Sequence, residues 1–196
     1  EHAMPRKKDD KIRQAIRDAG VDDVVDVGLG GTSLPRIARR AGLSQGTIYL
    51  YFDNKDALLQ DVYMEIKEAA HAQLMAATKG ATTSKERIQS IWNALIDFMI
   101  ENPKDFAFRE NVAAALALTQ DRQASLKAME QELLSILENA VADQTLKPAP
   151  IDSIVAVLVA PARHLARAAN TSATPLSARS RDETFHLIWA GISLID

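Results

Sequence analysis

Residues 32–55 read TSLPRIARRAGLSQGTIYLYFDNK. From Leu34 onward, apolar residues recur at i+3, i+4 and i+7, which is the spacing of one helix face turned inward. Gly42 stands where a left-handed residue would end that helix, and Ser44 can cap a second one. Two short helices joined by a tight glycine turn, each with one apolar side, form a helix-turn-helix. The stretch therefore predicts this motif.

The second of these helices has an unusual set of outward residues. Ile48 and Phe52 can point back toward the first helix. The positions left facing outward are Gln45, Gly46, Thr47, Tyr49, Leu50 and Tyr51. An amide, hydroxyls and aromatic rings are an odd choice for a merely solvated face, but they suit contacts with base edges and phosphates. A plain corner between two helices is the alternative interpretation.

The remainder of the chain is helical by its pattern. Beyond Gly46, glycine and proline become sparse and the segments are rich in alanine and leucine. The expected helices span about 8–20, 33–40, 45–52, 55–78, 84–101, 104–117, 120–143, 151–169 and 180–194. We expect an all-α fold of about nine helices. A three-helix helix-turn-helix domain at 5–54 is joined by a continuous helix to a larger bundle at 55–196, and the glycines at 28–31 form a turn.

The composition of the 196-residue chain is that of a globular protein, with 47% hydrophobic and 25% charged residues. It has no cysteine, which excludes disulfide bonds, thiol catalysis and cysteine-bound metals and fits a reducing cytoplasm. The longest apolar run, at 154–162, is too short to span a membrane, so we expect no membrane contact. The net charge of −3 argues against general polyanion binding, but basic residues gather at 5–17 and 32–55.

Several short runs between residues 11 and 59 belong to one recognisable pattern. They are Ser33-Leu34-Pro35-Arg36-Ile37-Ala38, Ala41-Gly42-Leu43-Ser44, Gly46-Thr47-Ile48-Tyr49, Tyr51-Phe52 and Asn54-Lys55. In these runs the chain resembles the TetR-type transcriptional regulators. The resemblance implies a ligand-responsive homodimer that binds a near-palindromic operator in double-stranded DNA. We expect a repressor that is released by a small-molecule effector.

The resemblance also implies which residues contact DNA. Those expected to touch phosphate or the sugar backbone are Thr32, Ser33, Thr47, Tyr49, Tyr51 and Lys55. Those expected to face the major groove are Gln45, Gly46 and Leu50, while Arg36 would reach a phosphate or a base. This division agrees with the chemistry, because glutamine can bond adenine at two atoms, whereas hydroxyls and lysine fix position without reading sequence.

The last two expected helices carry apolar residues on more than one side. The run at 154–162 is apolar all round, and the final helix has two apolar stripes. A helix that is apolar on two sides is buried on both, and in a chain of this size the second side can be another subunit. The expected interface residues are Ile154, Leu158, Leu165, Phe185, Trp189 and Ile192. The alternative is that both sides belong to the core of a monomer.

The helices expected between residues 84 and 117 mix aromatic with polar residues. A cavity lined by such groups suits a small, mostly apolar effector that is held by one or two polar anchors. The expected pocket residues are Trp92, Phe98, Phe106, Arg109 and His164. Aromatic residues at helical spacing can equally be plain core. We expect no cofactor and no metal.

Two Glu-x-x-His motifs offer an alternative from another class of protein. They are Glu68 with His71 and Glu183 with His186, on separate helices, as in a di-iron carboxylate oxidase. Such a site also needs an inward glutamate from each of two further helices, and no spare glutamate falls on an apolar face. The alternative is therefore disfavoured, and we expect no catalytic residues.

Overall fold

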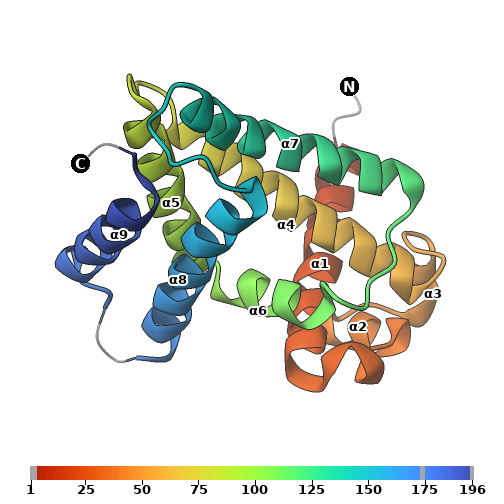
Figure 1. The fold of residues 1–196 in the computed structure, drawn as a ribbon. Helices are drawn as coiled ribbons and strands as arrows, with labels where there is room; N and C mark the ends of the chain where they lie inside the picture. Colours follow the sequence, from red (N-terminus) through yellow and green to blue (C-terminus); the bar gives the residue numbers. More distant parts are fainter. Residues whose placement is uncertain (1–3, 173–174, 195–196) are drawn as a thin grey trace. The chain divides into compact units, whose positions relative to one another are not determined.

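The computed structural model describes residues 4–172 and 175–194, with side chains from Asp9 onward. The described residues form nine α-helices and no β-strand, apart from an isolated bridge between Leu146 and Ser193 (Figure 1). The helices are α1 (Met4–Gly31), α2 (Leu34–Arg40), α3 (Gln45–Tyr49), α4 (Lys55–Ala77), α5 (Ser84–Glu101), α6 (Pro103–Val112), α7 (Gln120–Ala142), α8 (Ile151–Thr171) and α9 (Ala178–Ile192). The predicted all-α fold is confirmed. None of the described helices has the length and apolar character that crossing a membrane requires.

The first helix is longer than its predicted span of 8–20. It continues through Gly20, where an added Cβ would lie 3.0 Å from Cδ2 of Leu58 in α4. Gly20 is therefore a point of close helix contact and not a helix end. The helical conformation of α1 is interrupted at Gly28, which has a φ of +72°. The turn expected among the glycines therefore begins there.

The chain divides into two compact units. One unit runs up to Ile66 and includes Lys104–Arg122, and the other comprises Lys67–Pro103 and the residues from Gln123 onward. This division differs from the expected domains at 5–54 and 55–196. The N-terminal unit also takes in the first half of α4 and nearly all of α6, because charged side chains of α1 hold both helices.

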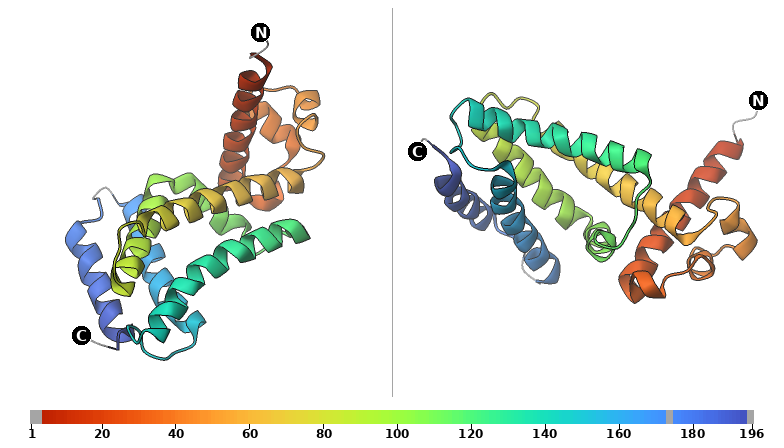
Figure 2. Two further views of the ribbon diagram at one scale, coloured as in Figure 1. Left: turned by 90° about the horizontal axis from the view of Figure 1, so that it is seen from above. Right: turned by 45° about the vertical axis from the view of Figure 1, so that its right-hand side comes forward.

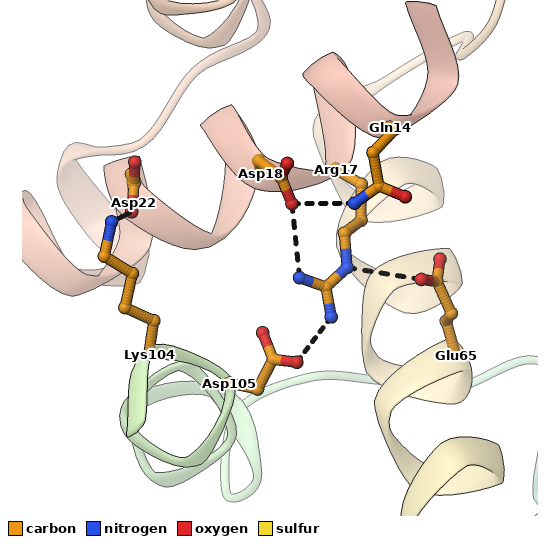
Figure 3. A network of polar contacts seen from close by, with 7 residues as sticks. All are labelled: Gln14, Arg17, Asp18, Asp22, Glu65, Lys104 and Asp105. Carbon is orange, nitrogen blue, oxygen red and sulfur yellow. Dashed lines mark hydrogen bonds and ion pairs between the residues drawn. The ribbon is translucent and has the colours of Figure 1, made fainter. Parts of the chain in front are cut away.

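Arg17 is the centre of this charged network in the N-terminal unit. Its Nη2 donates to Oδ2 of Asp105 in α6 at 2.5 Å, and its Nε donates to Oε1 of Glu65 in α4 at 3.3 Å (Figure 3). Lys104 of α6 adds a second link to α1, with its Nζ 2.7 Å from Oδ1 of Asp22. The side chains of Arg17 and Asp105 are only 18% and 12% exposed, so their ion pair is largely shielded from water.

The C-terminal unit is organised around an aromatic cluster. Helices α5, α8 and α9 lie side by side in Figures 1 and 2. Trp92 of α5 donates its indole N–H to the carbonyl oxygen of Leu158 in α8 at 2.9 Å. Its ring centroid lies 5.4 Å from that of Phe185 in α9, which in turn stacks on Trp189 at 5.8 Å. These buried rings join the three helices.

Candidate nucleic-acid interface

The turn between α2 and α3 has the geometry that its glycine predicts. Ser33 occupies the N-cap position of α2 but makes no side-chain cap bond. At the other end, the N–H of Gly42 donates to the Arg39 carbonyl at 3.2 Å, and the N–H of Leu43 donates to the Ala38 carbonyl at 2.9 Å. Gly42 has a φ of +68°. This arrangement is a Schellman motif, in which a left-handed residue lets the last carbonyls of a helix find donors.

The second helix of the motif is fixed at its start by Ser44. The Ser44 Oγ accepts a hydrogen bond from the backbone N–H of Thr47 at 3.1 Å and lies 2.8 Å from the Thr47 hydroxyl. Ile48 is fully buried, as the helix-turn-helix pattern predicts. Helix α3 ends at Tyr49, short of the predicted 45–52, because the next residues close into a turn with bonds of the i to i+3 type. We call residues 45–51 the recognition segment.

Most of the recognition segment is open to solvent. Gln45 and Gly46 are exposed, Tyr49 is 50% exposed and Leu50 is 84% exposed. A tyrosine and a leucine side by side on a surface offer contact to apolar groups such as the thymine methyl, next to an amide that can bond a base edge. Gln45, Gly46, Tyr49 and Leu50 are therefore accessible, and their contact with a duplex stays a prediction.

Thr32 and Lys55 donate to carbonyl groups at the kink near the end of α1. Thr32 is 3% exposed and its hydroxyl donates to the Gly28 carbonyl at 2.9 Å. The Lys55 Nζ donates to the Leu29 carbonyl at 3.0 Å. Carbonyl groups freed where a helix breaks need donors, and these two side chains supply them. The Thr32 hydroxyl and the Lys55 ammonium group are thus engaged within the chain in this structure, and their predicted phosphate contacts stay predictions.

The guanidinium of Arg36 is paired with a buried carboxylate of α1. Its Nη2 lies 3.1 Å from Oδ1 of Asp23 and its Nε lies 3.3 Å from Oδ2. Asp23 is only 1% exposed, and a buried carboxylate requires a cationic partner. Arg40 forms a second ion pair with this carboxylate, with its Nε 3.5 Å from Asp23 Oδ1, and its Nη2 lies 2.7 Å from Oδ2 of Asp26. The hydrogen bond to Asp26 raises the pKa of Arg40 above its ordinary value.

Tyr51 connects the end of the recognition segment to the first half of α1. Its hydroxyl donates to Oδ1 of Asp9 at 2.6 Å, and the Arg13 guanidinium carbon lies 5.5 Å from the centre of its ring. The hydrogen bond to Asp9 raises the pKa of Tyr51. Asp9 and Arg13 were not predicted from the sequence to lie at this surface. No local pattern marks them, since the contact joins residues 42 positions apart.

The residues predicted to line an effector pocket come from both units. Trp92 and Phe98 are buried in the C-terminal unit, while His164 of the same unit is exposed. Phe106 and Arg109 belong to the N-terminal unit, where Phe106 is buried. The aromatic members are core residues in this structure, which is the alternative that helical spacing left open.

The residues predicted to form a dimer interface face the interior of one chain. Buried residues of this set are Ile154, Leu158, Phe185, Trp189 and Ile192, with Leu165 partly buried. In the single chain these residues belong to the core, which is the alternative that the sequence left open. The exposed large apolar residues of this region are Val157 at 44%, Leu187 at 75% and Leu194 at 49%. An open depression on α9 is lined by Asp182, Glu183, His186 and Leu187.

The ligands that a di-iron site would require are not assembled in the described part of the chain, where no three histidine or carboxylate side chains gather to hold a metal. Glu68, Glu183 and His186 are exposed. His71 instead lies against α7, with its Nε2 3.0 Å from Oε2 of Glu132, although the two atoms do not form a hydrogen bond.

Comparison with known proteins places the helix-turn-helix in a family. Residues 16–62 match the family described as bacterial regulatory proteins, tetR family. The HTH-type transcriptional regulator BetI of Klebsiella pneumoniae is 34% identical over 83 residues, which cover 40% of this chain and 42% of that protein. The fatty acid metabolism regulator protein of Bacillus subtilis is 32% identical over 83 residues, or 42% of each chain. The chain thus matches about two-fifths of the length of these curated relatives.

Solved structures share the fold over nearly the whole chain. A TetR family transcription regulator from Marinobacter aquaeolei has a TM-score of 0.87 at 23% identity, covering 96% of this chain and 98% of that one. The ketosteroid transcriptional regulator KstR2 of Mycobacterium tuberculosis has a TM-score of 0.75 at 15% identity, covering 92% and 94%. Residues 16–62 thus match the model of the tetR family of bacterial regulatory proteins, and the chain as a whole shares the fold of these solved structures.

Proposed function

We propose that this chain is a DNA-binding transcriptional regulator that contacts a duplex with its recognition segment. The observation that carries the proposal is the exposure of Gln45, Tyr49 and Leu50 on a short helix. The Gly42 turn and the Ser44 cap hold that helix in place. The family match supports the proposal, since it covers this helix-turn-helix and the curated relatives are named as regulators.

The recognition segment supplies the sequence-dependent contacts. The Gln45 amide can donate and accept at an adenine edge, while Leu50 and Tyr49 pack on thymine methyls or sugars. Because Arg36 and Lys55 are engaged within the chain, they shape the surface that approaches the duplex and hold phosphates only if they change partners. Cations that do contact phosphate release counterions, so binding should fall steeply with salt.

The active form that we propose is a homodimer formed by the outer faces of α8 and α9. Val157 and Leu187 are exposed apolar side chains on these faces, as a self-complementary two-fold contact requires. Two such subunits would place their recognition helices about 34 Å apart, in successive major grooves of a near-palindromic operator. In this scheme residues 5–54 bind DNA, and residues 55–196 dimerise and receive the effector.

The effector that we propose is a small, mostly apolar molecule that releases the regulator from DNA, which makes the protein a repressor. Two similar proteins are named for fatty acid metabolism and for ketosteroids, and both names point to apolar compounds. To release DNA, the effector must bind the DNA-incompatible conformation a few kcal/mol more tightly than the DNA-bound one. Equal affinity for both conformations would have no effect.

The test is selection of duplexes from a random pool by the full chain, followed by binding to the recovered sequence. Gln45→Ala should reduce discrimination against random duplex, while Gln131→Ala, an exposed glutamine on α7, should not. Recovery of no common sequence, or equal discrimination by both variants, contradicts the proposal.

Two exposed leucines separate DNA contact from dimerisation. Leu50→Glu should abolish operator binding and leave the sedimentation of the dimer unchanged. Leu187→Glu should give a folded monomer, since Leu187 is 75% exposed in the single chain. A Leu187→Glu protein that still sediments as a dimer would remove the proposed interface. Trp189 is unsuitable for this purpose, because it is 5% exposed and its replacement would disrupt the core.

A further inference from the structure

We propose that Tyr51 and Arg13 form a phosphodiester-binding site, and that the carboxylate of Asp9 occupies this site in the free protein. DNA would then bind by displacing a side chain of the protein itself. The inference rests on the proposed DNA-binding function and on the backbone contact already expected of Tyr51, and it adds Arg13 as a second donor and Asp9 as an internal competitor.

The geometry of the three side chains supports this assignment. The Tyr51 hydroxyl donates to Oδ1 of Asp9 at 2.6 Å, and the Arg13 guanidinium carbon is 5.5 Å from the Tyr51 ring centre. Asp9 and Arg13 are both exposed and Tyr51 is half-buried, so the group is open to solvent. The first half of α1 lies beside α3 (Figure 2), and Tyr51 directly follows the exposed Tyr49 and Leu50.

A phosphodiester can replace the carboxylate at the Tyr51 hydroxyl, where the Arg13 guanidinium lies against the Tyr51 ring. Both groups carry one negative charge spread over two oxygens, and both accept from a phenolic O–H and from a guanidinium. The Asp9 oxygen on Tyr51 therefore stands where a phosphate oxygen of the duplex would stand. A phosphate has the further advantage of belonging to a polyanion, whose condensed counterions are released when cations of the protein approach.

Asp9 is able to leave the site. It is exposed, and ion pairs and hydrogen bonds at a surface compete with water, so its release costs little. Asp9 and Arg13 are four residues apart on α1, a spacing at which an acid preceding a base is attracted to it. The same charge opposes an incoming phosphate. Asp9 thus lowers the affinity for all duplexes and does not alter which sequence is preferred.

The experiment compares Asp9→Ala with Asp10→Ala in the full chain. Both variants remove one negative charge from neighbouring exposed positions of α1, but only Asp9 accepts from Tyr51. Asp9→Ala should raise the affinity for a random-sequence duplex about three- to tenfold, because the free protein loses the competing hydrogen bond. Asp10→Ala should change the affinity less than about twofold, since it removes only a screened charge.

Two further variants identify the donors. In the Asp9→Ala protein, adding Tyr51→Phe should remove the gain, because the freed hydroxyl is what binds phosphate. Arg13→Ala should make the dependence of log K on log salt concentration shallower by about 0.9, the effect of one phosphate contact. Tyr51 itself gives a readout without DNA. Its pKa, raised by Asp9, should return toward 10.0 in Asp9→Ala and stay raised in Asp10→Ala.

The possible results are distinct. Equal gains from Asp9→Ala and Asp10→Ala would reduce the effect to general charge and overturn the inference. A loss of affinity in Asp9→Ala would also overturn it, since Asp9 would then be positioning Tyr51 for DNA. Either result leaves the proposed function standing if the wild-type protein binds duplex. If the wild-type protein and all variants bind no duplex at low salt, both proposals are wrong.

Discussion

Replacing Arg17 by methionine tests how strongly α1 is held to α6. Methionine keeps the aliphatic part of the side chain and removes the guanidinium, which donates to Asp105 at 2.5 Å. The Asp105 side chain, which is 12% exposed in the structure, then lacks its cationic partner. Burial alone would lower the pKa of Arg17, but its hydrogen bond with Asp105 and the nearby carboxylates raise that pKa, so the charged pair is the favoured state.

The expected destabilisation follows from this burial. Removing one partner of a fully buried ion pair costs about 3–5 kcal/mol, because the other charge remains without compensation. Arg17 is 18% exposed, so water screens part of the interaction and we expect about 2–3 kcal/mol. With a urea m-value of about 2 kcal/mol/M, this loss moves the unfolding midpoint down by about 1–1.5 M.

The assay is urea unfolding followed by circular dichroism, with two comparison variants. Lys104→Met removes the other link between α6 and α1, but Lys104 is 69% exposed and the midpoint should not move measurably. Adding Asp105→Asn to Arg17→Met should recover at least half of the loss, because the amide has no charge to leave unpaired. A midpoint shift below about 0.25 M for Arg17→Met, or no recovery in the double variant, would refute this account.

Two further predictions concern a turn and a helix start. Gly42→Ala should destabilise the protein by about 1 kcal/mol, because Gly42 has a φ of +68°, whereas Gly46→Ala should be tolerated, since an added Cβ would meet nothing closer than 3.8 Å. Thermal unfolding distinguishes the two, and equal losses would contradict the argument. Hydrogen bonds from the Thr82 backbone and hydroxyl lower the pKa of Glu86 from its ordinary 4.5, so its stabilising effect is present above that pH and is lost as the pH falls through the lowered value. Glu86→Gln should therefore melt below the wild type at pH 7, and the gap should narrow as the pH falls below 4.5; a gap of constant size would contradict this.

The helix-turn-helix could be predicted because its determinants are local. The spacing of Leu34 and Ile37, the position of Gly42 and the cap at Ser44 each act within a few residues. The same holds for α5, where Thr83 and Glu86 form a reciprocal capping box at the predicted helix start. Such local patterns specify the same helices and turns however the rest of the chain is arranged.

Local sequence patterns could not predict which groups the charged side chains contact. Arg36 is outward on its own helix, yet it turns toward Asp23, 13 residues earlier, because a buried carboxylate requires a cation. Lys55 is drawn to the Leu29 carbonyl, 26 residues earlier, because a broken helix leaves that acceptor open. Each of these two contacts depends on an acceptor that is remote in sequence. The residues next to the arginine or lysine do not reveal that acceptor.

Sequence alone determined that this protein is helical, where its short motif lies and that its last two helices are apolar on more than one side, since helix periodicity and caps are properties of neighbouring residues. Tertiary structure alone decided which of those sides meets Trp92 and which stays open at Leu187. It also brought Asp9 to Tyr51. The physical reason is that a helix face or a charged side chain takes its partner from whatever the folded chain places beside it, and that neighbour is remote in sequence.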